Sequence, residues 1–285
     1  MIFGRKKKAR DAEDEAAESD APAASDDETG SVVDDLAGSA SAGGDADATD
    51  DTGADAAPDG ADADGSDASG LDTDALDATE WRTDGPFEVT ELSDAEPDPD
   101  APRIDLGSLV ITPVPGSELR LQVNEASEIV SAMLVLPVHG PGANGAEPEV
   151  VASSALELSA YAAPRSGGLW AELRDEISEA AVDVGGSAEL AAGPFGVELR
   201  RLLPVTTPTG EQGYQPSRMW VAEGPRWLLR GIVYGQAAIT DDDEDPAVAA
   251  VLGAFRDVVV RRGDEAMAPG DLLPMTMPAD LQPAE

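Results

Sequence analysis

Three arginines and two tryptophans lie close together in the C-terminal half of the chain, and their types suit ligand binding. Arg218 and Trp220 fall in one predicted strand, and Arg226, Trp227 and Arg230 belong to the next. A guanidinium group stacks on an indole ring, and it also recognises phosphates and carboxylates through paired hydrogen bonds. The cluster therefore has two interpretations. It is cation–π packing beside the core, or it recognises a phosphate, a carboxylate, an acidic partner or the acidic segment of the same chain.

Other residue types that perform chemistry are scarce or wrongly spaced. The chain has no cysteine and one histidine, His139, which excludes disulfides, thiolate metal sites and any pair of histidine ligands. No serine lies in a Gly-x-Ser-x-Gly elbow. No Gly-x-Gly-x-x-Gly run joins a predicted strand to a predicted helix, and residues 101–285 contain no lysine for a Walker A loop. We therefore expect no catalytic residue, no metal site and no cofactor, and we expect His139 to be an exposed loop residue.

Acidic side chains gather at two further places. Residues 241–245 directly precede Pro246, where acids cap a helix and interact favourably with its dipole. Binding of a divalent cation is the less favoured alternative for these acids. Glu157, Glu172, Asp175 and Glu176 have the residue types of an acid–base pair, but helical spacing predicts that they form a solvent-facing surface.

Alternating apolar and polar residues predict an antiparallel sheet. The pattern is clearest over residues 118–123, and the stretch from Trp227 to Val233 is apolar enough to be a central strand. The strands are expected at residues 105–113, 118–123, 128–138, 150–163, 187–190, 197–205, 214–222 and 226–236.

Two stretches show the period of an amphipathic helix. The first runs from Gly168 to Gly185, with Ser166 as its expected N-cap, and the second begins at Pro246 and ends near Asp257. The sequence thus predicts an α+β fold. It consists mainly of an antiparallel sheet of about seven strands with two amphipathic helices packed on one face, preceded by a long disordered acidic tail.

The charge distribution divides the chain. Residues 1–100 carry 31 acidic and 6 basic side chains and few aliphatic residues, so they cannot bury enough apolar surface to fold. We predict a disordered acidic tail over residues 1–80 and an extended arm or linker over 81–104. A single α+β domain over 105–278 and a frayed C-terminus over 279–285 follow. Trp81 and Phe87 are expected to dock the arm on the domain, the alternative being a linear motif for another protein.

The composition also bears on location and partners. Arg5, Lys6, Lys7 and Lys8 would give weak contact with an anionic membrane surface, which we do not expect because acids follow directly. No apolar run is long enough for a transmembrane segment, and no signal-peptide core follows the basic start. A cytoplasmic location is therefore expected. The net charge of −40 argues against sequence-nonspecific binding of nucleic acid.

Several short phrases resemble a known family. They are Gly85–Phe87 (GPF), Leu119–Leu121 (LRL), Ala162–Ser166 (AAPRS), Gly193–Gly196 (GPFG), Gly224–Gly231 (GPRWLLRG) and Arg261–Pro269 (RRGDEAMAP). Together, over residues 80–278, the chain resembles an uncharacterised actinobacterial family catalogued as domain of unknown function 3710. The resemblance implies a cytoplasmic actinobacterial protein, and it supplies no activity and no catalytic residue.

Two functions follow from these observations. The favoured one is a non-catalytic protein-interaction or scaffold domain with an acidic disordered arm and an unknown protein partner, because no catalytic constellation is found. The alternative is a small-molecule or anion-binding sensor, or an enzyme, that uses a pocket lined by Arg218, Arg226, Arg230, Trp220 and Trp227 between sheet and helices.

Overall fold

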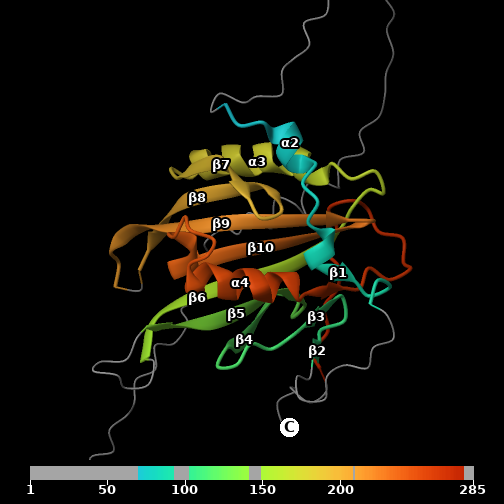
Figure 1. The fold of residues 1–285 in the computed structure, drawn as a ribbon, viewed down its shortest axis with the longest axis horizontal. Coiled ribbons are helices and arrows are strands. Elements are labelled where there is room, and N and C mark those ends of the chain that lie inside the picture. The colour runs from blue at the N-terminus through green and yellow to red at the C-terminus, as the bar shows by residue number, and fades with distance from the viewer. Residues whose placement is uncertain (1–69, 93–102, 141–148, 208, 279–285) are drawn as a thin grey trace, which may run out of the picture.

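A seven-stranded antiparallel sheet is the main element of the computed structural model, which describes residues 70–92, 103–140, 149–207 and 209–278 (Figure 1). Its strand order is β4-β5-β6-β10-β9-β8-β7. The predicted α+β fold with about seven antiparallel strands is therefore confirmed. The strands are β4 (Glu118–Val123), β5 (Ile129–Gly140), β6 (Glu149–Ala162), β7 (Ser187–Gly193), β8 (Gly196–Thr206), β9 (Gln212–Gly224) and β10 (Trp227–Gly235).

Two meanders form this sheet. The strands β4, β5 and β6 pair in succession, and so do β7, β8, β9 and β10. Antiparallel pairing of β10 with β6 joins the two meanders, with Trp227 opposite Ala162 and Gly235 opposite Ser154. The strand β10 is thus the fourth of seven, which confirms the central position predicted from its apolar sequence.

A second, four-stranded sheet was not predicted. It has the order β1-β11-β3-β2, and a predicted strand at residues 105–113 contributes to it in two pieces. Gly107 separates the pieces at a φ of +83°, a value that glycine adopts without steric cost. These strands are two or three residues long, too short for a pattern to reveal them. They are β1 (Phe87–Glu88), β2 (Ile104–Asp105), β3 (Leu109–Ile111) and β11 (Val259–Val260).

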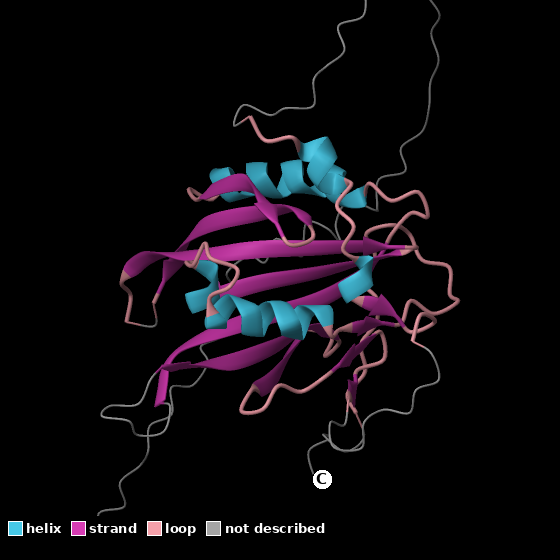
Figure 2. Ribbon diagram, viewed as in Figure 1, coloured by secondary structure: helices cyan, strands magenta, loops and turns pink. Residues whose placement is uncertain are grey.

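Three α-helices accompany the sheets in the described part of the chain, together with the 3-10 turns η1 (Arg82–Asp84) and η3 (Gln236–Ala238) (Figure 2). The helices are α2 (Thr73–Asp77), α3 (Leu169–Asp183) and α4 (Pro246–Arg256). The Asp245 side chain accepts a hydrogen bond from the Ala247 N–H at the start of α4, as the sequence predicts.

The long helices α3 and α4 pack on opposite faces of the sheet, so the expectation that both lie on one face was wrong. Leu229 of β10 packs in the same cluster as Phe255 of α4. Its neighbour Leu228 packs with Trp170 and Ile177 of α3. Because successive side chains of a strand point to opposite sides, each face of β10 serves a different helix.

A carboxylate from the sheet caps α3, and the predicted N-cap Ser166 does not. The position before the helix is Gly168, which has no side chain to offer. Glu223 of β9 instead accepts hydrogen bonds from the backbone N–H groups of Gly168, Leu169 and Trp170 at 3.0–3.4 Å. These are the N–H groups that a helix start leaves without intrahelical partners.

The stretch around α2 corrects the predicted boundary of the acidic tail at residue 80. Asp72 caps α2 by accepting from the Ala75 N–H, and Asp77 pairs with Arg174 of α3 at 2.8 Å. Residues 70–80 therefore belong to the folded body. The remaining parts of the predicted tail and C-terminus, including the basic residues 5–8, lie outside the described residues.

The arm that follows α2 contacts the body through its aromatic residues, as expected from its composition. The Trp81 ring makes edge contacts with Phe195 and Trp227, with 6.2 Å between ring centroids in both cases. Phe87 lies in β1, which pairs in parallel with β11. Within the described residues, no helix combines the length and apolarity needed to cross a membrane.

Phe255 ties α4 to the aromatic centre of the core. Its ring lies 4.7 Å from that of Phe195 and 6.0 Å from that of Trp220. Gly231 of β10 makes room for it, since a Cβ atom at this glycine would come within 2.5 Å of the ring.

We predict that Phe255→Ala lowers the free energy of unfolding by about 3–5 kcal/mol, because it removes a fully buried ring and leaves a cavity. Urea denaturation of the full chain measures the change. Leu252→Ala, at a half-buried position of the same helix, serves as the control and should lose clearly less. Equal losses for the two variants would contradict this account of how α4 packs.

Candidate functional site

The five residues of the predicted arginine–tryptophan site do not form one site. Arg218, Trp220 and Trp227 point to the face that α4 covers, and Arg230 points to the other face. Arg226 lies in the turn between β9 and β10, with a φ of 69°. In this register Arg218 pairs with Val233 and Arg230 with Val221, so the two arginines fall on opposite sides of the pleat.

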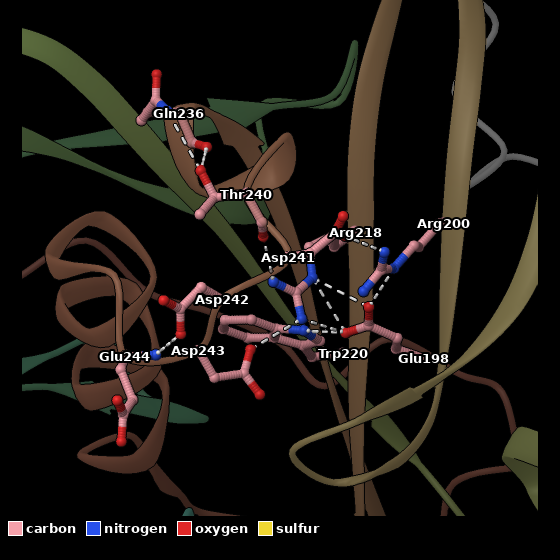
Figure 3. A network of polar contacts seen from close by, with 10 residues as sticks. All are labelled: Glu198, Arg200, Arg218, Trp220, Gln236, Thr240, Asp241, Asp242, Asp243 and Glu244. Carbon is pink, nitrogen blue, oxygen red and sulfur yellow. Dashed lines mark hydrogen bonds and ion pairs between the residues drawn. The ribbon is translucent and has the colours of Figure 1, made fainter.

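Arg218 is the centre of a buried polar network (Figure 3). Its side chain is 2% exposed, and its Nε and Nη2 donate to the Glu198 carboxylate at 2.9–3.1 Å. Its other contacts are the Thr240 carbonyl at 3.2 Å and the Asp243 carboxylate at 3.3 Å. The Trp220 Nε1 donates to the same Glu198 at 2.7 Å, and the guanidinium lies 5.3 Å from the Trp220 ring centroid. The predicted cation–π packing therefore exists for this pair.

The charged side chains of this network already bind one another, so none of them is left to bind a ligand. Glu198 also accepts a hydrogen bond from Arg200 at 2.7 Å, and Arg200 pairs with Asp241. The acids before α4 are thus engaged in capping and in ion pairs with arginines. Among the described residues, no group of three or more acidic, histidine or cysteine side chains is arranged to hold a metal ion. We interpret the network as a cross-link between β8, β9 and the segment that leads into α4.

A cavity of about 280 Å³ lies where α2, α3 and β9 meet. The two carboxylates in its wall are already engaged, since Asp77 pairs with Arg174 and Glu223 caps α3. None of the five predicted site residues lines it. The lining residues are Asp77, Trp81, Ser166, Gly167, Gly168, Trp170, Ala171, Phe195, Val221 and Glu223.

Two other arginines are buried without a carboxylate partner, on the face of the sheet opposite α4. Arg201 of β8 is 6% exposed and Arg230 of β10 is 4% exposed. Neither Nε atom has a hydrogen-bond partner among the residues that the structure describes. The Arg230 Nη2 reaches the Ser159 hydroxyl only at 3.5 Å, and no described acidic oxygen lies within ion-pair distance of either guanidinium.

Polar side chains from β6, β9 and β10 surround these arginines. Glu157 is 9% exposed and accepts a hydrogen bond from the Tyr234 hydroxyl at 3.3 Å. The Arg230 guanidinium lies 5.2 Å from the centroid of the Tyr161 ring. Ser217 lies opposite Arg201 in the sheet, and its hydroxyl has no hydrogen-bond partner among the described residues. We call this group the Arg201–Arg230 cluster; its members are Glu157, Ser159, Tyr161, Arg201, Ser217, Arg230 and Tyr234.

Burial controls the protonation states in this cluster. Burial lowers the pKa of Arg201. Tyr234 and the negative charge of Glu157 raise this pKa, while the like charge of Arg230 lowers it, and a guanidinium keeps its proton in proteins. Burial raises the pKa of the Tyr234 phenol, and the negative charge of Glu157 adds to this rise. Burial also raises the pKa of Tyr161. The cluster therefore combines two cations and one carboxylate with neutral phenols, and it carries excess positive charge.

An unpaired buried cation is costly, because its lost hydration amounts to several kcal/mol unless an opposite charge compensates for it. The guanidinium fork fits phosphate and carboxylate groups, which accept two parallel hydrogen bonds. A phosphate or carboxylate group is thus the kind of partner that would compensate for the excess positive charge of the cluster. In contrast, Arg218 has no capacity left for such a group.

Of the cluster, the sequence predicted only Arg230 as a site residue. Glu157 was expected to face solvent, and this was wrong because residues 157–162 of β6 are buried on both sides. Arg201 carried a faint signal: the pair Arg200–Arg201 places a charge on each side of β8. The sequence does not reveal on which of the two sides the arginine forms an ion pair. His139 is exposed, as predicted, but it lies in strand β5 opposite Val150 and not in a loop.

Comparison with known proteins matches the chain to a family that has no assigned activity. The family model described as "Protein of unknown function (DUF3710)" matches residues 85–284. This confirms the family resemblance found in the sequence. No curated protein and no solved structure matches the chain.

The same substitution at three buried arginines separates a structural role from a binding role. Arg218→Met is expected to lower the free energy of unfolding by about 3–5 kcal/mol, because it leaves the Glu198 carboxylate buried without its main partner. Arg201→Met and Arg230→Met are each expected to raise it by about 1–3 kcal/mol, because each removes a buried charged group whose Nε has no partner among the described residues. Urea denaturation of the three variants gives the comparison, and a loss of stability at all three positions would contradict the distinction.

Proposed function

Because the chain belongs to this family of proteins of unknown function, we propose its function from the site itself: a non-catalytic domain that binds an anionic ligand with Arg201 and Arg230. The observation that carries the proposal is the burial of two guanidinium groups whose Nε atoms have no partner. The proposal retains the binding role predicted from the sequence. It replaces the predicted arginine–tryptophan pocket with a different set of residues.

The composition of the Arg201–Arg230 cluster favours binding over chemistry. Its guanidinium and hydroxyl groups are hydrogen-bond donors, which stabilise a negative charge that is already present. Both tyrosines have raised pKa values and stay protonated near neutral pH, so they donate hydrogen bonds and do not act as bases. Glu157 is held by the Tyr234 hydroxyl.

Glu157 also limits the charge of the ligand. The cluster contains two arginines and this single acidic side chain, so the basic groups are in excess by one. A compact group with one or two negative charges, such as a phosphate or a carboxylate, compensates for that excess. A polyanion such as nucleic acid would face the acidic remainder of a chain whose net charge is −40.

Calorimetric titration of the full chain at low ionic strength tests the proposal. Inorganic phosphate and acetate are the probes, and they distinguish the two anion chemistries. We expect Arg201→Gln and Arg230→Gln each to weaken binding of the preferred anion by at least about tenfold, because loss of one partner of a buried charge pair costs more than 1.4 kcal/mol.

Arg226→Gln is the matched control. This arginine was part of the sequence-predicted site, but it lies in the turn outside the cluster, so the substitution should leave the affinity unchanged. The same affinity in all three glutamine variants would contradict the proposal.

A further inference from the structure

The cavity where α2, α3 and β9 meet has aromatic and acidic walls. Three of the residues that line it are aromatic, Trp81, Trp170 and Phe195. Two others are acidic, Asp77 and Glu223, and no basic residue of the described chain lines it. Aromatic rings attract a cation through their negatively polarised faces, and acidic side chains attract it through their charge. This composition suits a positively charged ligand.

The acidic side chains of the cavity have little hydrogen-bonding capacity left. Both carboxylate oxygens of Asp77 accept from Arg174, at 2.8–2.9 Å. Glu223 accepts three hydrogen bonds at 3.0–3.4 Å, all from backbone N–H groups at the start of α3. No basic side chain in the described part of the chain lies within ion-pair distance of Glu223. A ligand therefore meets an acidic group without a basic partner, but few acceptors for N–H donors.

This combination distinguishes between classes of cation. A metal ion needs ligand atoms that converge on it, and the described residues contain no such group of three acidic, histidine or cysteine side chains. A primary ammonium carries three donors, and each needs an acceptor once it leaves water. A quaternary ammonium has no donor, so it needs only an opposite charge and contact with aromatic rings. The volume of about 280 Å³ is near the lower limit of ligand pockets, which favours a small molecule.

We propose that this cavity binds a small quaternary ammonium compound, with Trp81, Trp170 and Phe195 as aromatic walls and Glu223 as the opposite charge. Trp81 is the most accessible of the three aromatic residues, since it is half-buried while the other two are buried. Its ring already interacts with one cation, the Arg82 guanidinium, which lies 5.5 Å from the ring centroid.

Calorimetric titration of the full chain with choline and with 3,3-dimethyl-1-butanol tests the proposal. The two molecules have the same shape, but the second has a carbon atom in place of the charged nitrogen. We expect choline to bind at least about tenfold more tightly than this neutral analogue, and also more tightly than ethanolamine, whose ammonium group carries donors. Absence of choline binding, or binding of either analogue as tight as that of choline, would overturn the proposal.

The proposed function is not at stake in these titrations, because the cavity shares no residue with the Arg201–Arg230 cluster. Phosphate and acetate probe the cluster, and choline probes the cavity. A chain that binds choline but neither anion would contradict the proposed function alone.

Substitution of Trp81 locates the site. Trp81→Leu removes an aromatic wall but keeps an apolar side chain, so it should weaken choline binding by at least about fivefold. Trp81→Phe keeps a ring and should bind choline more tightly than Trp81→Leu. Tyr214→Leu is the matched control, because Tyr214 is 60% exposed on β9 and does not line the cavity, and it should leave the affinity unchanged.

Nuclear Overhauser effects locate the site in the native chain without any substitution. The methyl protons of bound choline should show them to the indole protons of Trp81 and Trp170. Choline that binds without these effects, or with the same affinity in the native and Trp81→Leu chains, occupies another site, and either result would contradict the proposal.

Discussion

The register between β9, β10 and β6 is the constraint on which the rest of this structure depends. Once Arg218 is opposite Val233 and Arg230 is opposite Ser159, every neighbouring side chain is committed to one of two faces. One face receives the aromatic core under α4, and the other receives α3 and the Arg201–Arg230 cluster. A slip of one residue would exchange the two sets. The strand β10 is buried over most of its length, so it can serve both faces.

Buried arginines on the two faces of the sheet have different surroundings. Arg218 forms an ion pair with Glu198, contacts Asp243 at 3.3 Å and stacks on the Trp220 ring. These contacts compensate for the cost of burying its charge. Arg201 and Arg230 are buried almost as deeply with no ion pair to a described residue. In a protein whose acids outnumber its bases by 40, the absence of an ion pair to a described residue at these two arginines is a specific arrangement. The cost of keeping two such cations is our reason for assigning function to this face.

The connections outside the sheet attach α2, α3 and the arm to the body. Helix α2 is held to α3 by one buried arginine, and Glu223 fixes the start of α3 to β9. The segments that follow α2 and α4 meet in the small sheet through the pairing of β1 with β11. The body therefore includes residues 70–92, which local composition alone assigns to the tail and the arm.

The sequence by itself determined the features that depend on neighbouring residues. These were the strand segments, the two long helices, the Asp245 cap with Pro246, and the family to which the chain belongs. Alternation along a strand and periodicity along a helix are local properties, so they can be read directly. Only the tertiary structure decided which faces α3 and α4 cover, that Glu223 caps α3, and that Arg201 joins Arg230 while Arg218 pairs with Glu198. Each of these depends on which strands become neighbours and in which register, and that choice is made by packing between segments far apart in the chain.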